Sequence, residues 1–273
     1  MIGTISEMLS HAFIQRALLV GILISLCAAL LGVSLVLKRY SMIGDGLSHV
    51  GFGILTVATA FGATSPLYIA IPCVTIAAIV LLKIGNNSKI KSDSAIALIS
   101  SSALAIGVAV TSLTTGMNTD VCNFMFGSIL AMSKSDVVLS IIVSIIVAAL
   151  FIIYYRKLFV VTFDEEFAKA SGLKAKRYTS IIAVLTALII VVGMRMMGVM
   201  LISSIIIFPA LTSMRIFKSF KKVVISSAIV SIVSFLIGIY LSYIYNISTG
   251  AMIVIVNLVL FILFSIIDKI IHD

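Results

Sequence analysis

The sequence predicts an all-α integral membrane protein, a polytopic bundle of eight to nine transmembrane helices with one short helix in the cytoplasm. Hydrophobic residues make up 62% of the chain, and its mean hydropathy of +1.29 lies far above the balance of a soluble domain. Apolar runs of about 17–23 residues recur along the length, and a helix of that length crosses about 30 Å of hydrocarbon. Since no polar stretch is long enough to fold separately, we expect a single domain over residues 1–273.

Nine apolar runs define the expected spans, and charged or turn-forming residues separate them. The first run ends at the basic pair Lys38-Arg39, and Ser65-Pro66 divides the second run from the third. Gly85-Asn86-Asn87 ends the third run, and Thr115-Gly116 follows the fourth. The second and seventh runs are short and could merge into re-entrant elements. The runs lie at about 17–37, 47–63, 66–82, 93–114, 136–155, 179–194, 198–214, 223–245 and 250–268.

The segment 117–132 is not expected to cross the membrane fully. Asp120, Asn123 and Gly127 interrupt its apolar character. An irregular segment at membrane depth must be buried in protein or line a cavity. It could therefore border a transport pathway, or it could be an ordinary helix of an outer loop.

The net charge of +9 is explained by membrane topology. When the loops alternate with residues 156–177 in the cytoplasm, 16 of the 19 Lys and Arg residues lie on that side, and Arg16, Lys134 and Arg195 lie outside. This distribution follows the positive-inside rule. It predicts an outer N-terminus and a cytoplasmic C-terminus, and it argues against nucleic acid as a partner.

Asp45 and His49 are candidate metal ligands in the segment S-M-I-G-D-G-L-S-H-V-G-F-G, residues 41–53. If this segment is helical from about Asp45, the two side chains share one face at i and i+4. A carboxylate and an imidazole can both reach one divalent ion of the zinc or manganese type. Asp45 could instead be an N-cap, and His49 could simply form a hydrogen bond. Ionisable groups are costly within membrane spans, which favours a functional role.

Residues 156–177 hold nine of the chain's 29 charged side chains. Phe163, Phe167 and Ala170 recur there at helical spacing, acidic residues fill the expected first turn, and Ser171-Gly172 is a plausible end. The pattern predicts a two-turn amphipathic helix in the cytoplasm. It could lie on the membrane surface, although exposed phenylalanines on so short a helix fit better in the groove of a partner protein.

Three motifs in order give the chain a resemblance to a known family. E-F-A-K-A-S-G at 166–172 resembles the coupling motif E-A-A-x-x-x-G of ATP-binding-cassette importer permeases, with Phe167 in place of the first alanine. G-D-G-L-S-H after K-R-Y, and M-G-V-M-L-I-S-S-I-I-I-F-P-A-L-T-S at 197–213, resemble the permeases of zinc/manganese-type importers. The similarity covers nearly the whole chain. Ile205-Ile206-Ile207 departs from the small residues often found before F-P-A.

The resemblance implies a membrane-spanning permease of a bacterial cell membrane, one of two copies around a central pathway. Its implied partners are cytoplasmic ATPase subunits and an extracellular or periplasmic metal-binding protein. Asp45 and His49 would pass the metal, zinc or manganese or also iron, as substrate, with no permanently bound cofactor. The helix that couples to the ATPase would present these residues: Phe163, Asp164, Glu165, Glu166, Phe167, Ala168, Ala170 and Gly172.

Two other functional classes fit the sequence less well. An ATP-independent carrier or channel would be expected to hold acidic residues deep in several spans, whereas this chain concentrates its candidates near Asp45. The chain has no G-x-x-x-x-G-K-[ST], so ATP hydrolysis is expected in a separate subunit. It also lacks H-E-x-x-H and G-x-S-x-G, and we therefore do not expect an enzyme.

Overall fold

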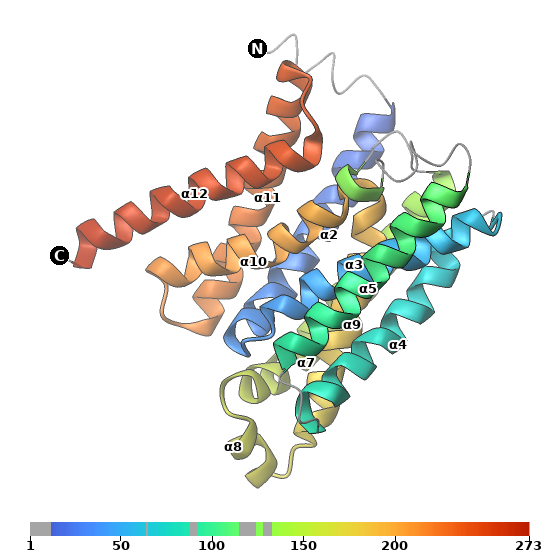
Figure 1. Cartoon of the computed structure of the whole chain (residues 1–273). Coiled ribbons are helices and arrows are strands. Elements are labelled where there is room, and N and C mark those ends of the chain that lie inside the picture. Colours follow the sequence, from blue (N-terminus) through green and yellow to red (C-terminus); the bar gives the residue numbers. More distant parts are fainter. Residues whose placement is uncertain (1–11, 64, 88–91, 115–123, 128–132, 273) are drawn as a thin grey trace.

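The computed structural model describes residues 12–63, 65–87, 92–114, 124–127 and 133–272 of the chain. These residues form helices without a β-strand, which confirms the all-α prediction. Nine long helices and the short α8 make up the described fold (Figure 1): α2 Ala12–Leu37, α3 Ser41–Ala60, α4 Pro66–Asn87, α5 Ser92–Leu113, α7 Lys134–Phe163, α8 Glu165–Ala170, α9 Ala175–Met197, α10 Val199–Ile216, α11 Phe220–Tyr245 and α12 Thr249–His272.

Eight of the long helices in the described part of the chain are long and apolar enough to cross a membrane. The ninth, α3, has 20 residues but is less apolar, because it contains Asp45, His49 and several glycines. The count therefore falls within the predicted range of eight to nine. The seventh predicted run, 198–214, is a full helix, α10, of 18 residues.

Successive long helices alternate in direction, with α10 and α12 oblique to their neighbours, and α8 lies at one end of the bundle (Figure 1). Helix α2 begins at the opposite end and runs toward α8, where Lys38 lies beside Glu165. Asp136 at the start of α7 pairs with Arg195 near the end of α9, away from α8. Helix α5 ends and α7 begins at this same far end.

Several helices extend beyond the predicted runs, and the longest extension is at the end of α7. Helix α7 continues to Phe163 instead of ending near residue 155, and α9 starts at Ala175 instead of about 179. The extra turns of α7 are stabilised by aromatic packing, because Phe159 and Phe163 both stack on the ring of Phe220 at centroid distances of 5.1 and 5.9 Å. The charged segment 156–177 is thus mostly helix rather than loop.

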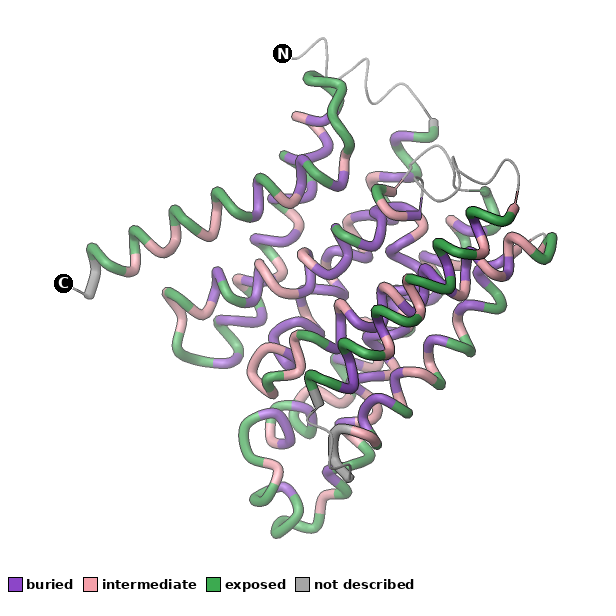
Figure 2. Tube along the Cα trace, in the orientation of Figure 1, coloured by how far each residue is buried: buried purple, intermediate pink, exposed green. Residues whose placement is uncertain are grey.

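Among the eight candidate spans, α2 and α9 are the most buried, and α5, α7 and α12 are the most exposed (Figure 2). The main hydrophobic cluster takes residues from all nine long helices. Two glycines allow especially close approach. The backbone carbonyl of Ile206 in α10 occupies the space of a side chain at Gly32, and a Cβ on Gly53 would lie 2.5 Å from the carbonyl oxygen of Ala103.

Most of segment 117–132 lies outside the described residues, but 124–127 is described. Phe124 is buried, and the Arg195 guanidinium lies 5.7 Å from its ring centroid. Gly127, at φ +78°, packs on the backbone of Met197 and Gly198, where α9 passes into α10. This short piece is therefore fixed on the bundle at the end away from α8.

Candidate functional site

Asp45 and His49 both lie inside α3, which begins at Ser41 with Tyr40 as its N-cap. Helix α3 starts one turn earlier than the sequence suggested, so Asp45 belongs to the second turn and does not act as the N-cap. The two side chains share a face, and His49 Nε2 lies 3.7 Å from Asp45 Oδ2. The His49 side chain is 26% exposed and the Asp45 side chain is 45% exposed, so the pair is half-buried and open on one side.

This geometry fits a shared divalent ion better than a direct hydrogen bond. A hydrogen bond would need a distance of about 3 Å. Two ligands that each lie about 2.1 Å from one ion are separated by about 3.0–3.5 Å, which is close to the observed spacing. The other ring nitrogen of His49, Nδ1, is buried and has no hydrogen-bond partner among the described atoms.

The neighbours of α3 hold this face in place. Ser48 Oγ accepts or donates a hydrogen bond at 3.1 Å with Ser203 Oγ, which belongs to the 197–213 motif on α10. Ser48 also donates to the carbonyl oxygen of Asp45 at 2.7 Å. A Cβ on Gly46 would lie 2.5 Å from the Ile96 side chain of α5. Helices α5 and α10 thus pack tightly beside the two candidate ligands.

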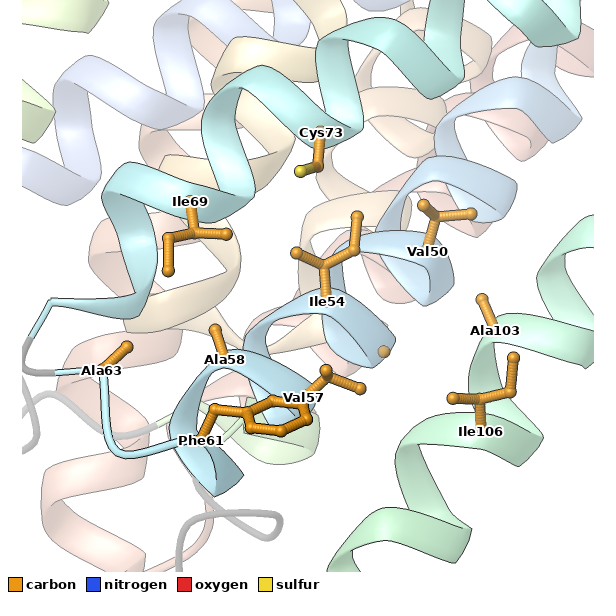
Figure 3. Close-up of a pocket in the computed structure, with 11 residues that line it drawn as sticks. Val50, Ile54, Val57, Ala58, Phe61, Ala63, Ile69, Cys73, Ala103 and Ile106 are labelled. Atoms are coloured by element: carbon orange, nitrogen blue, oxygen red, sulfur yellow. The ribbon is translucent and has the colours of Figure 1, made fainter.

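Asp45 and His49 are the two candidate ligands in the described part of one chain. Within the described part of the chain, no group of three His, Cys, Asp or Glu side chains could hold a metal ion. A cavity of about 530 Å³ opens between α3, α4 and α5, but its lining is apolar apart from the Cys73 thiol (Figure 3). Ile54 of α3 and Phe61, which directly follows α3, face it from one side, with Ile69 of α4 opposite (Figure 3). This cavity would offer a metal ion almost no ligands, so Asp45 and His49 remain the candidate ligands.

The predicted short amphipathic helix is present as α8. It has six residues, close to two turns, with Glu165 and Glu166 in its first turn and Ser171 as its C-cap. Phe163 is the last residue of α7, and Asp164 is the N-cap, whose Oδ1 accepts from the backbone N–H of Phe167 at 2.8 Å. This cap ends α7 and starts α8 at one residue. Gly172, at φ +79°, ends the segment in open space.

Helix α8 has an inner and an outer face. Ala168 is fully buried against Val161 and Ala175, and it anchors α8 to α7 and α9. Phe167, Glu166 and Ala170 are exposed. Helix α8 therefore offers an aromatic and acidic surface beyond the bundle, whereas the predicted apolar face of Phe163, Phe167 and Ala170 does not pack inward.

Lys38 belongs to this region and was not predicted as a site residue. Its Nζ donates to the carbonyl oxygen of Val161 at 3.0 Å, and to Glu165 Oε2 and Thr179 Oγ1 at 3.2 Å each. The side chain is only 6% exposed. From sequence, Lys38 reads as one of many basic residues that flank spans, since only the fold brings α7, α8 and α9 around it.

Comparison with known proteins identifies relatives over almost the whole chain. The family model described as the ABC 3 transport family matches residues 10–268. The high-affinity zinc uptake system membrane protein ZnuB of Haemophilus influenzae is 34% identical over 248 residues, which cover 90% of this chain and 94% of that protein. The manganese transport system membrane protein MntC of Listeria monocytogenes is 29% identical over 265 residues, which cover 93% and 90%.

The fold is also similar to a solved structure, PsaBC from Streptococcus pneumoniae in complex with Fab. The TM-score is 0.86 with 30% sequence identity, and the match covers 97% of this chain and 95% of the other.

Proposed function

Since the chain belongs to the ABC 3 transport family, we infer that it is the membrane-spanning permease subunit of an ATP-driven importer of divalent metal ions. Family membership favours ATP-driven transport over the alternative of an ATP-independent carrier or channel. The relatives named above are manganese and zinc transport proteins, so these two ions are the first candidates as substrate. The observation that carries the function is a carboxylate and an imidazole 3.7 Å apart on a helix within the bundle.

Asp45 and His49 bind the ion during its passage. Both ligand types suit zinc, manganese and iron(II), and two ligands hold an ion less tightly than the four of a structural zinc site. Weak binding is what a passage requires, because the ion must leave again. The half-exposed face of the pair supports this role, since the ion can reach it without unfolding of α3.

Two copies of the chain form the passage, and their Asp45–His49 pairs face each other. A symmetric dimer would supply up to four N and O ligands from two pairs. The shortage of other ligands supports this arrangement, because the described residues of one chain hold no group of three. The nine long helices of each copy act as one permease domain.

Helix α8 receives the energy of ATP hydrolysis from a separate ATPase subunit. Phe163, Glu166 and Phe167 are exposed at the end of the bundle and can fill a groove of that subunit. Asp164 caps the start of α8, and Gly172 lies just beyond its end. The buried Ala168 packs α8 against the bundle. The first and last residues of α8 are Glu165 and Ala170. Movement of α8 then shifts the helices between outward and inward access.

The α8 end of the bundle faces the cytoplasm, the side on which the positive-inside rule puts most basic residues. The N-terminus and the Arg195–Asp136 pair are then outside, where an extracellular or periplasmic metal-binding protein delivers the ion. The C-terminus is in the cytoplasm of a bacterial cell.

Reconstitution tests the function directly. The chain is placed in lipid vesicles with its ATPase and binding protein, and ATP hydrolysis is measured with manganese, zinc, iron(II) or magnesium. One or more of the first three should stimulate hydrolysis, and magnesium above the amount needed for ATP should not. Equal hydrolysis with and without every transition metal would contradict the proposed function.

A further inference from the structure

Lys38 joins four parts of the protein through one ammonium group. A lysine ammonium has three N–H donors, and Lys38 directs them to Val161 at the end of α7, to Glu165 in α8 and to Thr179 in α9. Among the described residues, Lys38–Glu165 is the one ion pair that joins α8 to another part of the bundle. With the side chain 6% exposed, solvent screens this pair only weakly.

The chain turns tightly between Lys38 and α3. Helix α2 ends in a left-handed cap, a conformation that glycine usually adopts, but here Arg39 occupies it with φ +58°. The N–H of Tyr40 donates to the carbonyl of Leu35 at 2.8 Å, and the Tyr40 carbonyl accepts from the N–H of Ile43 at 3.0 Å. Tyr40 is thus bonded to the end of α2 and to the start of α3 at once. A displacement of Lys38 must therefore move the first turn of α3.

The charge of α8 also reaches this turn. Burial, together with the nearby negative charge of Glu165, raises the pKa of the Tyr40 hydroxyl. The Lys38 ammonium lies 5.9 Å from the centroid of the Tyr40 ring. Glu165, Lys38 and Tyr40 therefore form a continuous contact from α8 to α3, and Asp45 follows five residues after Tyr40.

We propose that Lys38 is a positioning residue that transmits the movement of α8 to the start of α3, and so to Asp45 and His49. This inference rests on the proposed function. The ATPase binds the outer face of α8, whereas Lys38 contacts α8 from the bundle side through its ion pair with Glu165. The bonds to Val161 and Thr179 keep Lys38 aligned, so that a shift of α8 changes the position of α3 instead of only breaking the pair.

The test measures how many metal ions enter per ATP hydrolysed by the complete importer in lipid vesicles. Lys38→Met keeps an unbranched side chain that is one heavy atom shorter, and it removes all three donors. It is expected to lower this ratio at least about fivefold, the range of a typical coupling between two sites. Lys83→Met makes the same substitution at an exposed lysine of α4, at the same end of the bundle, and should keep the wild-type ratio.

A second readout separates transmission from folding. Met42 lies in the first turn of α3 and is 50% exposed, so Met42→Cys can carry a fluorescent label in a background without the three native cysteines. Addition of a non-hydrolysable ATP analogue should change the fluorescence of the label, and Lys38→Met should reduce this change per assembled complex. A merely structural role would lower the yield of complex and leave the change per complex intact.

If the importer with Lys38→Met does not assemble, Glu165→Gln provides a second test. It removes the ion pair and leaves the Lys38 bonds to Val161 and Thr179 in place, so it should also lower the ratio. The inference is overturned if an assembled variant of either kind keeps the wild-type ratio and label response. Absence of uptake by the unsubstituted importer would instead contradict the proposed function.

Discussion

Nε2 of His49 and Oδ2 of Asp45 are 3.7 Å apart on adjacent turns of α3, and nothing polar among the described atoms binds the other ring nitrogen of His49. Neither side chain caps a helix. A metal ion between Nε2 of His49 and Oδ2 of Asp45 would give these two atoms a shared partner, and the first prediction follows from that.

Removal of either ligand should weaken metal binding without unfolding the protein. His49→Ala or Asp45→Asn is expected to lower the affinity for manganese at least about tenfold, since loss even of an outer-shell partner costs that much. Both side chains are partly exposed, so the helix should remain intact. The affinity is measured by titrating manganese with protein and recording how the electron paramagnetic resonance signal of the free ion decreases. Asp93→Asn, which changes an exposed carboxylate of α5, is the matched control. Equal affinity of all variants would rule out the pair as a binding site.

Phe167 should contribute to binding of the ATPase and little to the stability of the permease. Its side chain is 60% exposed, and truncation of a central aromatic contact commonly costs about 2 kcal/mol or more of binding free energy. Phe167→Ala should therefore weaken binding of the ATPase roughly 30-fold. A titration with labelled ATPase measures this effect. Phe61→Ala, at the opposite end and 86% exposed, should bind the ATPase normally. If both variants bound alike, α8 would not be the docking element.

Two glycines of α3 should respond oppositely to alanine. A Cβ on Gly53 would lie 2.5 Å from the carbonyl oxygen of Ala103, so Gly53→Ala must push α3 and α5 apart and should destabilise the fold by about 1–3 kcal/mol. A Cβ on Gly44 would meet only the Ile206 side chain at 3.7 Å, an ordinary contact. Gly44→Ala should be neutral or stabilising, because alanine favours helix. Unfolding midpoints in detergent compare the two, and a lower midpoint for Gly44→Ala than for Gly53→Ala would contradict the packing described above.

The pair Asp136–Arg195 should stabilise the end of the bundle away from α8. Arg195 Nη2 donates to Asp136 Oδ2 at 2.9 Å, and the two side chains are 14% and 9% exposed. Asp136→Asn or Arg195→Met alone removes one member of a nearly buried ion pair and should cost about 3 kcal/mol. The double variant should lose roughly 1–3 kcal/mol less than the sum of the single variants. Unfolding by SDS in mixed micelles gives the three free energies, and strict additivity would show that the pair is not coupled.

Much of the fold follows from apolar runs alone, because backbone groups in lipid must bond within their own helix. The sequence therefore predicts every long helix approximately. It misses the end of α7 and the start of α9. At the end of α7, aromatic contacts with Phe220 extend a helix that charge alone would end near residue 155. It predicts α8 as a short helix, but not that Asp164 is both the C-cap of α7 and the N-cap of α8.

The candidate site shows the same division. The i, i+4 spacing of Asp45 and His49 is a local property, so the sequence places the two side chains on one face. Lys38 could not be recognised in this way. Its partners are 123, 127 and 141 residues distant in the chain, and only the packed bundle brings them to one ammonium group.

Uptake of radioactive manganese or zinc into vesicles that hold the complete importer tests the central claim most directly. The wild-type importer should accumulate metal only when ATP reaches the ATPase, and Asp45→Ala with His49→Ala should show no accumulation above the ATP-free background while the complex still assembles. Uptake at the wild-type rate by that double variant would contradict passage of the metal through this pair.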